Sequence, residues 1–156
     1  MIRNPNWADL IFKSDQFQYG GKCAIHFAAD QGHVEIVKFL ATLVDNPNPQ
    51  DTLGYTPIYH AASEGHLEIV KYLAPLSQID INASSYTEKM TPIHTAALSG
   101  HSEVVKFLCS FTKTNPFFLD YNGKSPLDYA IESRLIGQNN VESYDECIRI
   151  LKFFMK

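Results

Sequence analysis

Thr91-Pro-Ile-His-Thr-Ala96 and the following Gly100-His-Ser-Glu-Val-Val-Lys-Phe-Leu108 decide the fold, because both strings recur along the chain. The first has relatives in Cys23-Ala-Ile-His-Phe-Ala28, Thr56-Pro-Ile-Tyr-His-Ala61 and Ser125-Pro-Leu-Asp-Tyr-Ala130, and the second in Gly32-His-Val-Glu-Ile-Val-Lys-Phe-Leu40 and Gly65-His-Leu-Glu-Ile-Val-Lys-Tyr-Leu73. Successive copies of the first string start 33, 35 and 34 residues apart. A period of this length indicates a stack of similar supersecondary units.

Each unit carries residues that suit two short helices. Thr56 can cap the start of a helix, and Pro57 follows at a position that needs no amide proton. Gly65 can end that helix in a left-handed conformation, and Glu68 then lies in the first turn of a second helix, where the helix dipole favours it. The first unit has Cys23 in place of the threonine, so we expect its first helix to start less firmly. Such a short helix pair cannot bury its apolar faces alone, so neighbouring units must complete the core.

The paired strings resemble the ankyrin repeat, which has a period near 33 residues and a Thr-Pro-Leu-His-x-Ala signature. The resemblance covers the chain from about Tyr19 onward. It implies an all-α ankyrin-repeat solenoid, in which stacked helix-turn-helix pairs are joined by β-hairpin-like loops. We expect an N-terminal cap segment at 1–18 and an ankyrin-repeat domain at 19–156, with repeats at about 19–51, 52–86, 87–119 and 120–156.

The fourth repeat departs from the pattern by about a dozen extra residues near 134–145. We expect a lengthened first helix, then a surface loop, then a second helix from about Tyr144 to Phe154. The extra residues are either a decoration of a terminal repeat or part of a binding face. The final Phe153-Phe154-Met155-Lys156 is apolar for an outer cap, so these side chains either fold inward or belong to a longer array.

The composition favours a globular intracellular protein. Hydrophobic residues make up 45% of the chain and charged residues 19%, which is typical of a packed domain. The net charge of −4 provides no excess of positive charge for binding nucleic acid or an anionic membrane surface. The three cysteines are odd in number and lack Cys-x-x-Cys spacing, which argues against a disulfide framework or a zinc site. We therefore expect a cytoplasmic monomer, with the nucleus as the alternative compartment, and no metal or other cofactor.

No arrangement of residues predicts catalysis. The family resemblance implies that five of the six histidines hydrogen-bond the backbone and hold loops together; these are His26, His33, His66, His94 and His101. His60 lies off those positions, and one histidine is not a site. No cysteine has a paired base, and Gly20-Gly21 lacks the Lys-Ser/Thr of a phosphate-binding loop. We therefore predict that the chain is not an enzyme.

A candidate site follows from the family's partner surface, transferred by position. In ankyrin-repeat proteins, the hairpin tips between repeats and the exposed side of the first helices form a concave surface that binds other proteins. The implied tip residues are Tyr19, Lys22, Thr52, Leu53, Tyr55, Thr87, Glu88, Met90, Tyr121, Asn122 and Lys124. The implied first-helix residues are Phe27, Asp30, Gln31, His60, Ser63, Glu64, Thr95, Leu98, Ser99, Tyr129, Glu132 and Ser133.

This surface is rich in aromatic and apolar residues, which are favoured at the centres of interfaces. Our hypothesis is that Tyr55, Met90 and Tyr129 anchor a partner protein. The plainer interpretation is that such residues merely stiffen the hairpins. The connection from the second to the third repeat is two residues longer than the preceding one and has Lys89 where a glycine is expected, so we expect a distorted hairpin there.

The leading function is a protein-interaction module that acts as an adaptor or an inhibitor. One alternative, implied by the family, is a substrate of asparaginyl hydroxylation at a repeat-closing asparagine, matched by Asn48, Asn82 and Asn115. Only Asn48 has a leucine, Leu40, eight residues before it, as that enzyme prefers, so Asn48 is the modification candidate. Another alternative is a regulatory module of a larger enzyme.

Overall fold

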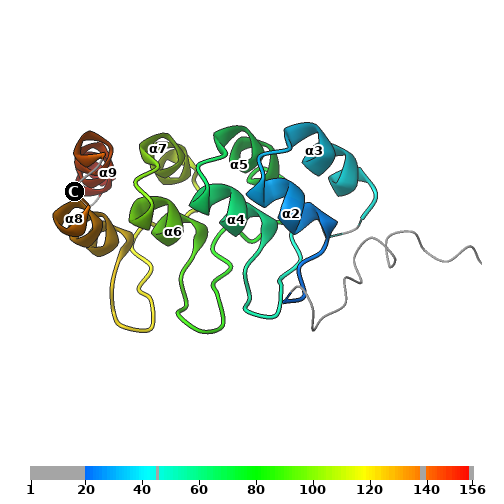
Figure 1. Ribbon diagram of the computed structural model, residues 1–156, viewed down its shortest axis with the longest axis horizontal. Helices are drawn as coiled ribbons and strands as arrows, with labels where there is room; N and C mark the ends of the chain where they lie inside the picture. The colour runs from blue at the N-terminus through cyan, green and yellow to red at the C-terminus, as the bar shows by residue number, and fades with distance from the viewer. Residues whose placement is uncertain (1–19, 45, 138–139, 155–156) are drawn as a thin grey trace, which may run out of the picture.

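The structure is a computed structural model that describes residues 20–44, 46–137 and 140–154. The described residues form eight α-helices in two layers (Figure 1). The inner layer comprises α2 (Ala24–Asp30), α4 (Pro57–Ser63), α6 (Pro92–Leu98) and α8 (Pro126–Ile136), and the outer layer comprises α3 (Val34–Thr42), α5 (Leu67–Leu73), α7 (Ser102–Ser110) and α9 (Val141–Phe154). Each inner helix packs on the next one and on the outer helix of its own repeat. The expected all-α solenoid is confirmed.

Three hairpin loops connect successive repeats and project from the same side of the stack (Figure 1). They precede α4, α6 and α8 and lie next to one another, so residues at matching loop positions form a row. The expected N-terminal cap at 1–18 lies outside the described residues and stays a prediction.

The inner helices begin at the predicted caps. The Thr56 hydroxyl accepts a hydrogen bond from the Tyr59 amide at 3.2 Å, and Pro57 occupies the first turn of α4. In α2, the Cys23 amide donates instead to Nδ1 of His26 at 3.1 Å, so a histidine side chain supplies the cap. The same contact is present in α6, where the Thr91 amide donates to Nδ1 of His94, so a weaker start of α2 stays a prediction.

The core lies between the two layers and runs through all four repeats. Ile58 of α4 and Leu73 of α5 are 0% exposed, as are the alanines Ala61 and Ala62, where adjacent inner helices meet. Burying a side chain of the size of isoleucine or leucine stabilises the fold by about 1.5–3 kcal/mol. Small alanines let the inner helices approach closely, so much of this burial depends on the neighbouring repeat.

Histidines tie the inner-to-outer turns of adjacent repeats together. Gly65 ends the α4 unit at φ 78°, and a Cβ atom there would lie 2.5 Å from the ring of His101. That ring is held because its Nε2 donates to the Ser63 carbonyl at 2.9 Å. His66 makes the equivalent bond to the Asp30 carbonyl, also at 2.9 Å. The structural role implied for these histidines agrees with these contacts.

The fourth repeat lengthens both of its helices. Helix α8 has 11 residues where the other inner helices have 7, and α9 has 14. The lengthened first helix was expected, but α9 starts at Val141 rather than near Tyr144, so most of the extra residues are helical and the loop is short. Contacts with the third repeat hold the earlier start of α9 in place. The Tyr144 hydroxyl donates to the Leu98 carbonyl at 3.2 Å, and Ser143 Oγ donates to the Gly100 carbonyl.

Candidate partner-binding surface

Buried aspartates organise the first and third hairpins. Asp51 Oδ1 accepts hydrogen bonds from the Leu53 and Tyr55 amides, both at 2.9 Å. Asp120 Oδ1 accepts from the Asn122 and Lys124 amides in the same way, both at 2.8 Å. Each carboxylate therefore accepts hydrogen bonds from two backbone amides of a tight turn that would otherwise lack partners. These bonds fix the shape of the hairpin tip.

The second hairpin is built differently, because Ser85 stands where the others have aspartate. Its backbone closes from the Ser85 amide to the Met90 carbonyl at 2.9 Å, which makes this loop one residue longer than Asp51–Tyr55. Lys89 takes a left-handed conformation at φ 56°, which is unfavourable for a residue other than glycine. The Glu88 carboxylate folds back and accepts from Ser85 Oγ, Thr87 Oγ1 and the Tyr55 hydroxyl. The distorted hairpin expected from the sequence is present.

Backbone hydrogen bonds join each tip to the preceding one. The Thr52 amide donates to the Gly20 carbonyl at 2.9 Å, the Tyr86 amide to Leu53 at 2.8 Å, and the Tyr121 amide to Glu88 at 2.8 Å. Tyr86 is therefore the equivalent of Thr52 and Tyr121, and its side chain is 59% exposed. Tyr86 was not among the residues predicted for this surface, although it follows Asn82 by the same four residues by which Thr52 follows Asn48.

We call the accessible residues of the tips and inner helices the inner strip. Its exposed members are Phe27, Gln31, Thr52, Leu53, Glu64, Tyr86, Thr87, Glu88, Leu98, Tyr121 and Asn122. Its partly exposed members are Lys22, Asp30, Tyr55, Ser63, Ser99, Lys124, Tyr129, Glu132 and Ser133. Tyr19, which was assigned to the same surface, lies outside the described residues.

Three residues assigned to this surface are buried instead. Met90 is 6% exposed, His60 7% and Thr95 3%. Met90 closes the longer hairpin, since its amide donates to Ser85 Oγ at 3.1 Å and its carbonyl accepts from the Ser85 amide at 2.9 Å. His60 is buried between Asp30 and Asp51, and Thr95 hydrogen-bonds the Tyr59 side chain of the preceding repeat. The prediction that Met90 anchors a partner is wrong because Met90 is buried.

The other two predicted anchors, Tyr55 and Tyr129, are built into the hairpin bases. Tyr55 stacks on Tyr59 with ring centroids 4.5 Å apart. The Tyr129 hydroxyl donates to Asp120 Oδ2 at 2.6 Å, and burial together with this bond raises the pKa of Tyr129. Burial alone would raise the pKa of Asp120, but the bonds from Tyr129 and from the loop amides outweigh it and lower that pKa. Both tyrosines therefore hold hairpins in place, and their role as anchors of a partner stays a prediction.

His60 lies between carboxylates of two repeats. Its Nδ1 is 3.4 Å from Asp30 Oδ1, and its Nε2 is 3.5 Å from Asp51 Oδ2. Burial lowers the pKa of His60 and the charge of Lys22 adds to this, while the two carboxylates act in the opposite direction. The arrangement joins α2, α4 and the first hairpin in one polar cluster below the inner strip.

The inner strip has an apolar edge and a polar edge. Leu53, Tyr86 and Tyr121 are 46%, 59% and 66% exposed, and they lie on three successive hairpin tips. Along the C-terminal ends of the inner helices the residues are mostly polar, including Glu64 and Glu132. Glu132 is already paired with Lys124 at 2.7 Å. The apolar edge is the part of the strip that gains most from leaving water.

The modification candidates differ in their surroundings. Asn48 is 7% exposed, and its Oδ1 accepts from the Ile58 amide at 3.1 Å. Asn82 Nδ2 donates to the Lys113 carbonyl at 2.7 Å, and its Oδ1 accepts from the Asn115 amide at 2.8 Å. Asn115 lies five residues before Asp120, whereas Asn48 and Asn82 lie three before their hairpins, so Asn115 is out of register. Modification of Asn48 stays a prediction and requires local opening around its side chain.

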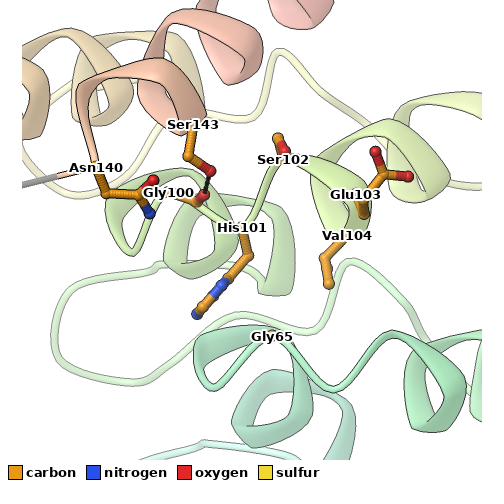
Figure 2. A pocket seen from close by; sticks show the side chains of 8 residues that line it. All are labelled: Gly65, Gly100, His101, Ser102, Glu103, Val104, Asn140 and Ser143. Atoms are coloured by element: carbon orange, nitrogen blue, oxygen red, sulfur yellow. Dashed lines mark hydrogen bonds between the residues drawn. The ribbon is translucent and has the colours of Figure 1, made fainter.

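A shallow pocket of about 210 Å³ lies where the α6–α7 turn meets the start of α9. Figure 2 shows the lining residues and the hydrogen bond from Ser143 Oγ to the Gly100 carbonyl. His101, the only histidine in this lining, is already bonded to the Ser63 carbonyl, so the pocket belongs to the joint between repeats. Within the part of the chain that the structure describes, no three His, Cys, Asp or Glu side chains are grouped to hold a metal ion.

Comparison with known families agrees with this architecture. A family model described as "Ankyrin repeats (3 copies)" matches residues 4–85 and 78–152. The chain belongs to the ankyrin-repeat family. Ankyrin repeats are generally protein-protein interaction modules, and the family is typically non-catalytic. A search of curated proteins found no match to this ankyrin-repeat chain. Among its described helices, none has the length and apolar character needed to cross a membrane.

Proposed function

We propose that this ankyrin-repeat chain is a non-enzymatic adaptor or inhibitor that binds a partner protein across the inner strip. The observation that carries the proposal is the row of exposed apolar side chains on three successive hairpin tips, Leu53, Tyr86 and Tyr121. Tyrosine is enriched among residues that dominate binding energy, because it buries a large area and keeps a polar hydroxyl.

The rigidity of the row supports the same function. The tips are joined by backbone hydrogen bonds of 2.8–2.9 Å, and Lys89 lies over the Tyr121 ring at 5.0 Å from its centroid. A surface that is ordered before it binds loses less conformational entropy on association than a mobile loop does. The partner therefore meets apolar side chains on three ordered tips, with Tyr86 and Tyr121 at equivalent positions and Leu53 one residue after the equivalent Thr52.

The test compares two variants of the tagged chain in cells of its native host. Tyr86→Ala combined with Tyr121→Ala removes most of the apolar row, whereas Phe39→Ala removes an aromatic side chain of similar exposure, 62%, from outer helix α3. Affinity purification with mass spectrometry identifies partners of the unaltered chain. We expect the purified partner to bind the tip variant at least about tenfold more weakly and the Phe39 variant as tightly as the unaltered chain. Equal affinity of all three proteins contradicts the proposal.

We place this activity in the cytoplasm, with the nucleus as the alternative compartment. Cys23, Cys109 and Cys147 are free thiols and all three are buried, which suits a reducing compartment. Microscopy of the fluorescently tagged chain in its native host tests the location, and a secreted product would contradict it.

A further inference from the structure

His60 faces two carboxylates that belong to different elements of the stack. It is 7% exposed, and its buried Nε2 has no hydrogen-bond partner among the described residues. Nδ1 lies 3.4 Å from Asp30 Oδ1 at the end of α2, and Nε2 lies 3.5 Å from Asp51 Oδ2 in the first hairpin. Both separations are longer than a normal hydrogen bond of about 2.9 Å, so the ring is bonded firmly to neither carboxylate.

The surroundings of His60 favour its neutral ring. Burial is the main reason that the pKa of His60 falls below its ordinary value, and the charge of Lys22 adds to this, against the opposing effect of the two carboxylates. The rings of His26, Tyr55 and Tyr59 also face it, with centroids 5.8–6.2 Å away. They add no negative charge at neutral pH, because burial raises the pKa of both tyrosines. A neutral imidazole has one N–H, so it can donate to only one carboxylate.

The proton of the neutral ring belongs on Nε2. The Asp51 side chain is only 2% exposed, so a lone pair directed at its carboxylate would meet a repulsion that water cannot screen. Nδ1 is then an acceptor, and it faces a second acceptor, Asp30 Oδ1, on a side chain that is 29% exposed. The other oxygen, Asp30 Oδ2, accepts from Gln31 Nε2 at 2.9 Å. We call His60 Nδ1 and Asp30 Oδ1 the acceptor pair.

The acceptor pair suits a cationic group that offers more than one donor. An arginine guanidinium has its donors in a rigid planar fork, so it can donate to both acceptors at once while its charge neutralises Asp30. Phe27 is 41% exposed and precedes Asp30 by three residues, so it shares that side of α2 and offers an aromatic ring to a flat cation. Glu64 is exposed at the end of the neighbouring helix α4 and adds negative charge to the same edge of the inner strip.

We propose that the acceptor pair is a subsite of the inner strip that binds an arginine side chain of the partner protein. This inference rests on the proposed function and names one chemical group that the partner presents beside the apolar residues it places on the hairpin tips. The tips supply apolar contact area, and the acceptor pair selects partners that carry an arginine at the matching place.

NMR titration of the isotope-labelled chain with N-acetyl-arginine amide tests the subsite without a partner protein. We expect saturable binding in the millimolar range, seen as a shift of the His60 Nδ1 resonance. N-acetyl-citrulline amide has nearly the same shape but a neutral urea group, and it should bind at least about tenfold more weakly.

Two variants locate the bound arginine probe. Asp30→Asn keeps the size of the side chain but removes its charge, so it should weaken binding of the probe at least about tenfold. Glu35→Gln makes the same change on outer helix α3, where Glu35 is paired with Lys38, and should bind the probe as the unaltered chain does. Circular dichroism verifies that both variants fold.

The subsite is wrong if the arginine probe leaves the His60 resonances unchanged, if both probes bind equally, or if binding survives Asp30→Asn. The comparison of the two probes on the unaltered chain decides the matter even where Asp30→Asn does not fold. Failure of the proposed function is a separate result, because the variant with Tyr86→Ala and Tyr121→Ala should still bind the arginine probe whatever its affinity for a partner.

Discussion

At the scale of single residues, His26 shows how one neutral side chain joins two repeats. Its Nδ1 accepts from the Cys23 amide at 3.1 Å, and its Nε2 faces the Pro49 carbonyl at 2.9 Å and the Tyr55 carbonyl of the next repeat at 3.2 Å. Only the neutral ring with its proton on Nε2 can make both bonds. Burial is the main reason that the pKa of His26 falls to about 4, and the nearby His60 adds to the effect.

This pKa predicts a loss of stability in mild acid. The unfolded chain binds a proton on His26 near pH 6.5, while the folded chain does so only near pH 4. The stabilisation is therefore complete above about pH 6.5 and is lost as the pH falls through about 4. Between pH 7 and 5 this residue alone should lower the free energy of unfolding by about 2 kcal/mol.

Urea unfolding at the two pH values measures this effect. His26→Gln should reduce the acid-dependent loss by about 2 kcal/mol, while the control His33→Gln, at an exposed ring, should leave it unchanged. His60 and His94, whose pKa values burial also lowers, keep their own share of the loss in both variants. A loss in His26→Gln as large as that of the unaltered chain would contradict the assignment.

At the scale of elements, α9 is held to the third repeat by a tyrosine where earlier repeats use a histidine. The Tyr144 ring packs on Gly100 as the His101 ring packs on Gly65. A Cβ atom added to Gly100 would lie 2.9 Å from the Tyr144 ring. Tyr144→Phe keeps the ring but removes the bond to the Leu98 carbonyl, so it should cost about 1 kcal/mol. Tyr144→Ala also empties the contact and should cost about 2 kcal/mol or more. Thermal unfolding measures both changes, and Tyr121→Phe, at an exposed hairpin tip, should have almost no effect.

The helices and the surface differ in how far the sequence predicted them. Thr56 and Pro57 act at the start of their own helix, and Gly65 supplies a local positive φ, so their positions could be predicted from local chemistry. The burial of Met90 and the exposure of Tyr86 depend on one additional residue in a hairpin, and Ser85 in place of aspartate reorganises that loop. The start of α9 depends on contacts of Ser143 and Tyr144 with another repeat, and these contacts have no local sequence signal.

At the scale of the whole molecule, stability resides in the junctions between repeats. Ile36 and Ile69 occupy the same position in α3 and α5, yet Ile36 is 49% exposed and Ile69 is 0% exposed. Ile69→Ala should therefore lower the free energy of unfolding by about 2–5 kcal/mol, and Ile36→Ala by less than about 1 kcal/mol. Urea denaturation of the two variants compares the same chemical change in two settings. Equal losses would mean that the junction adds nothing at this position.

The amide-to-carbonyl contacts between successive hairpins have a mechanical consequence. They lie one after another along the stack, from Thr52 to Tyr86 to Tyr121, so a pulling force applied to the two ends passes through every joint in series. Joints in series all carry the same force, so the weakest joint opens first while the others stay closed. A single molecule stretched from its ends should therefore lengthen in steps, each releasing one helix pair, instead of rupturing all at once.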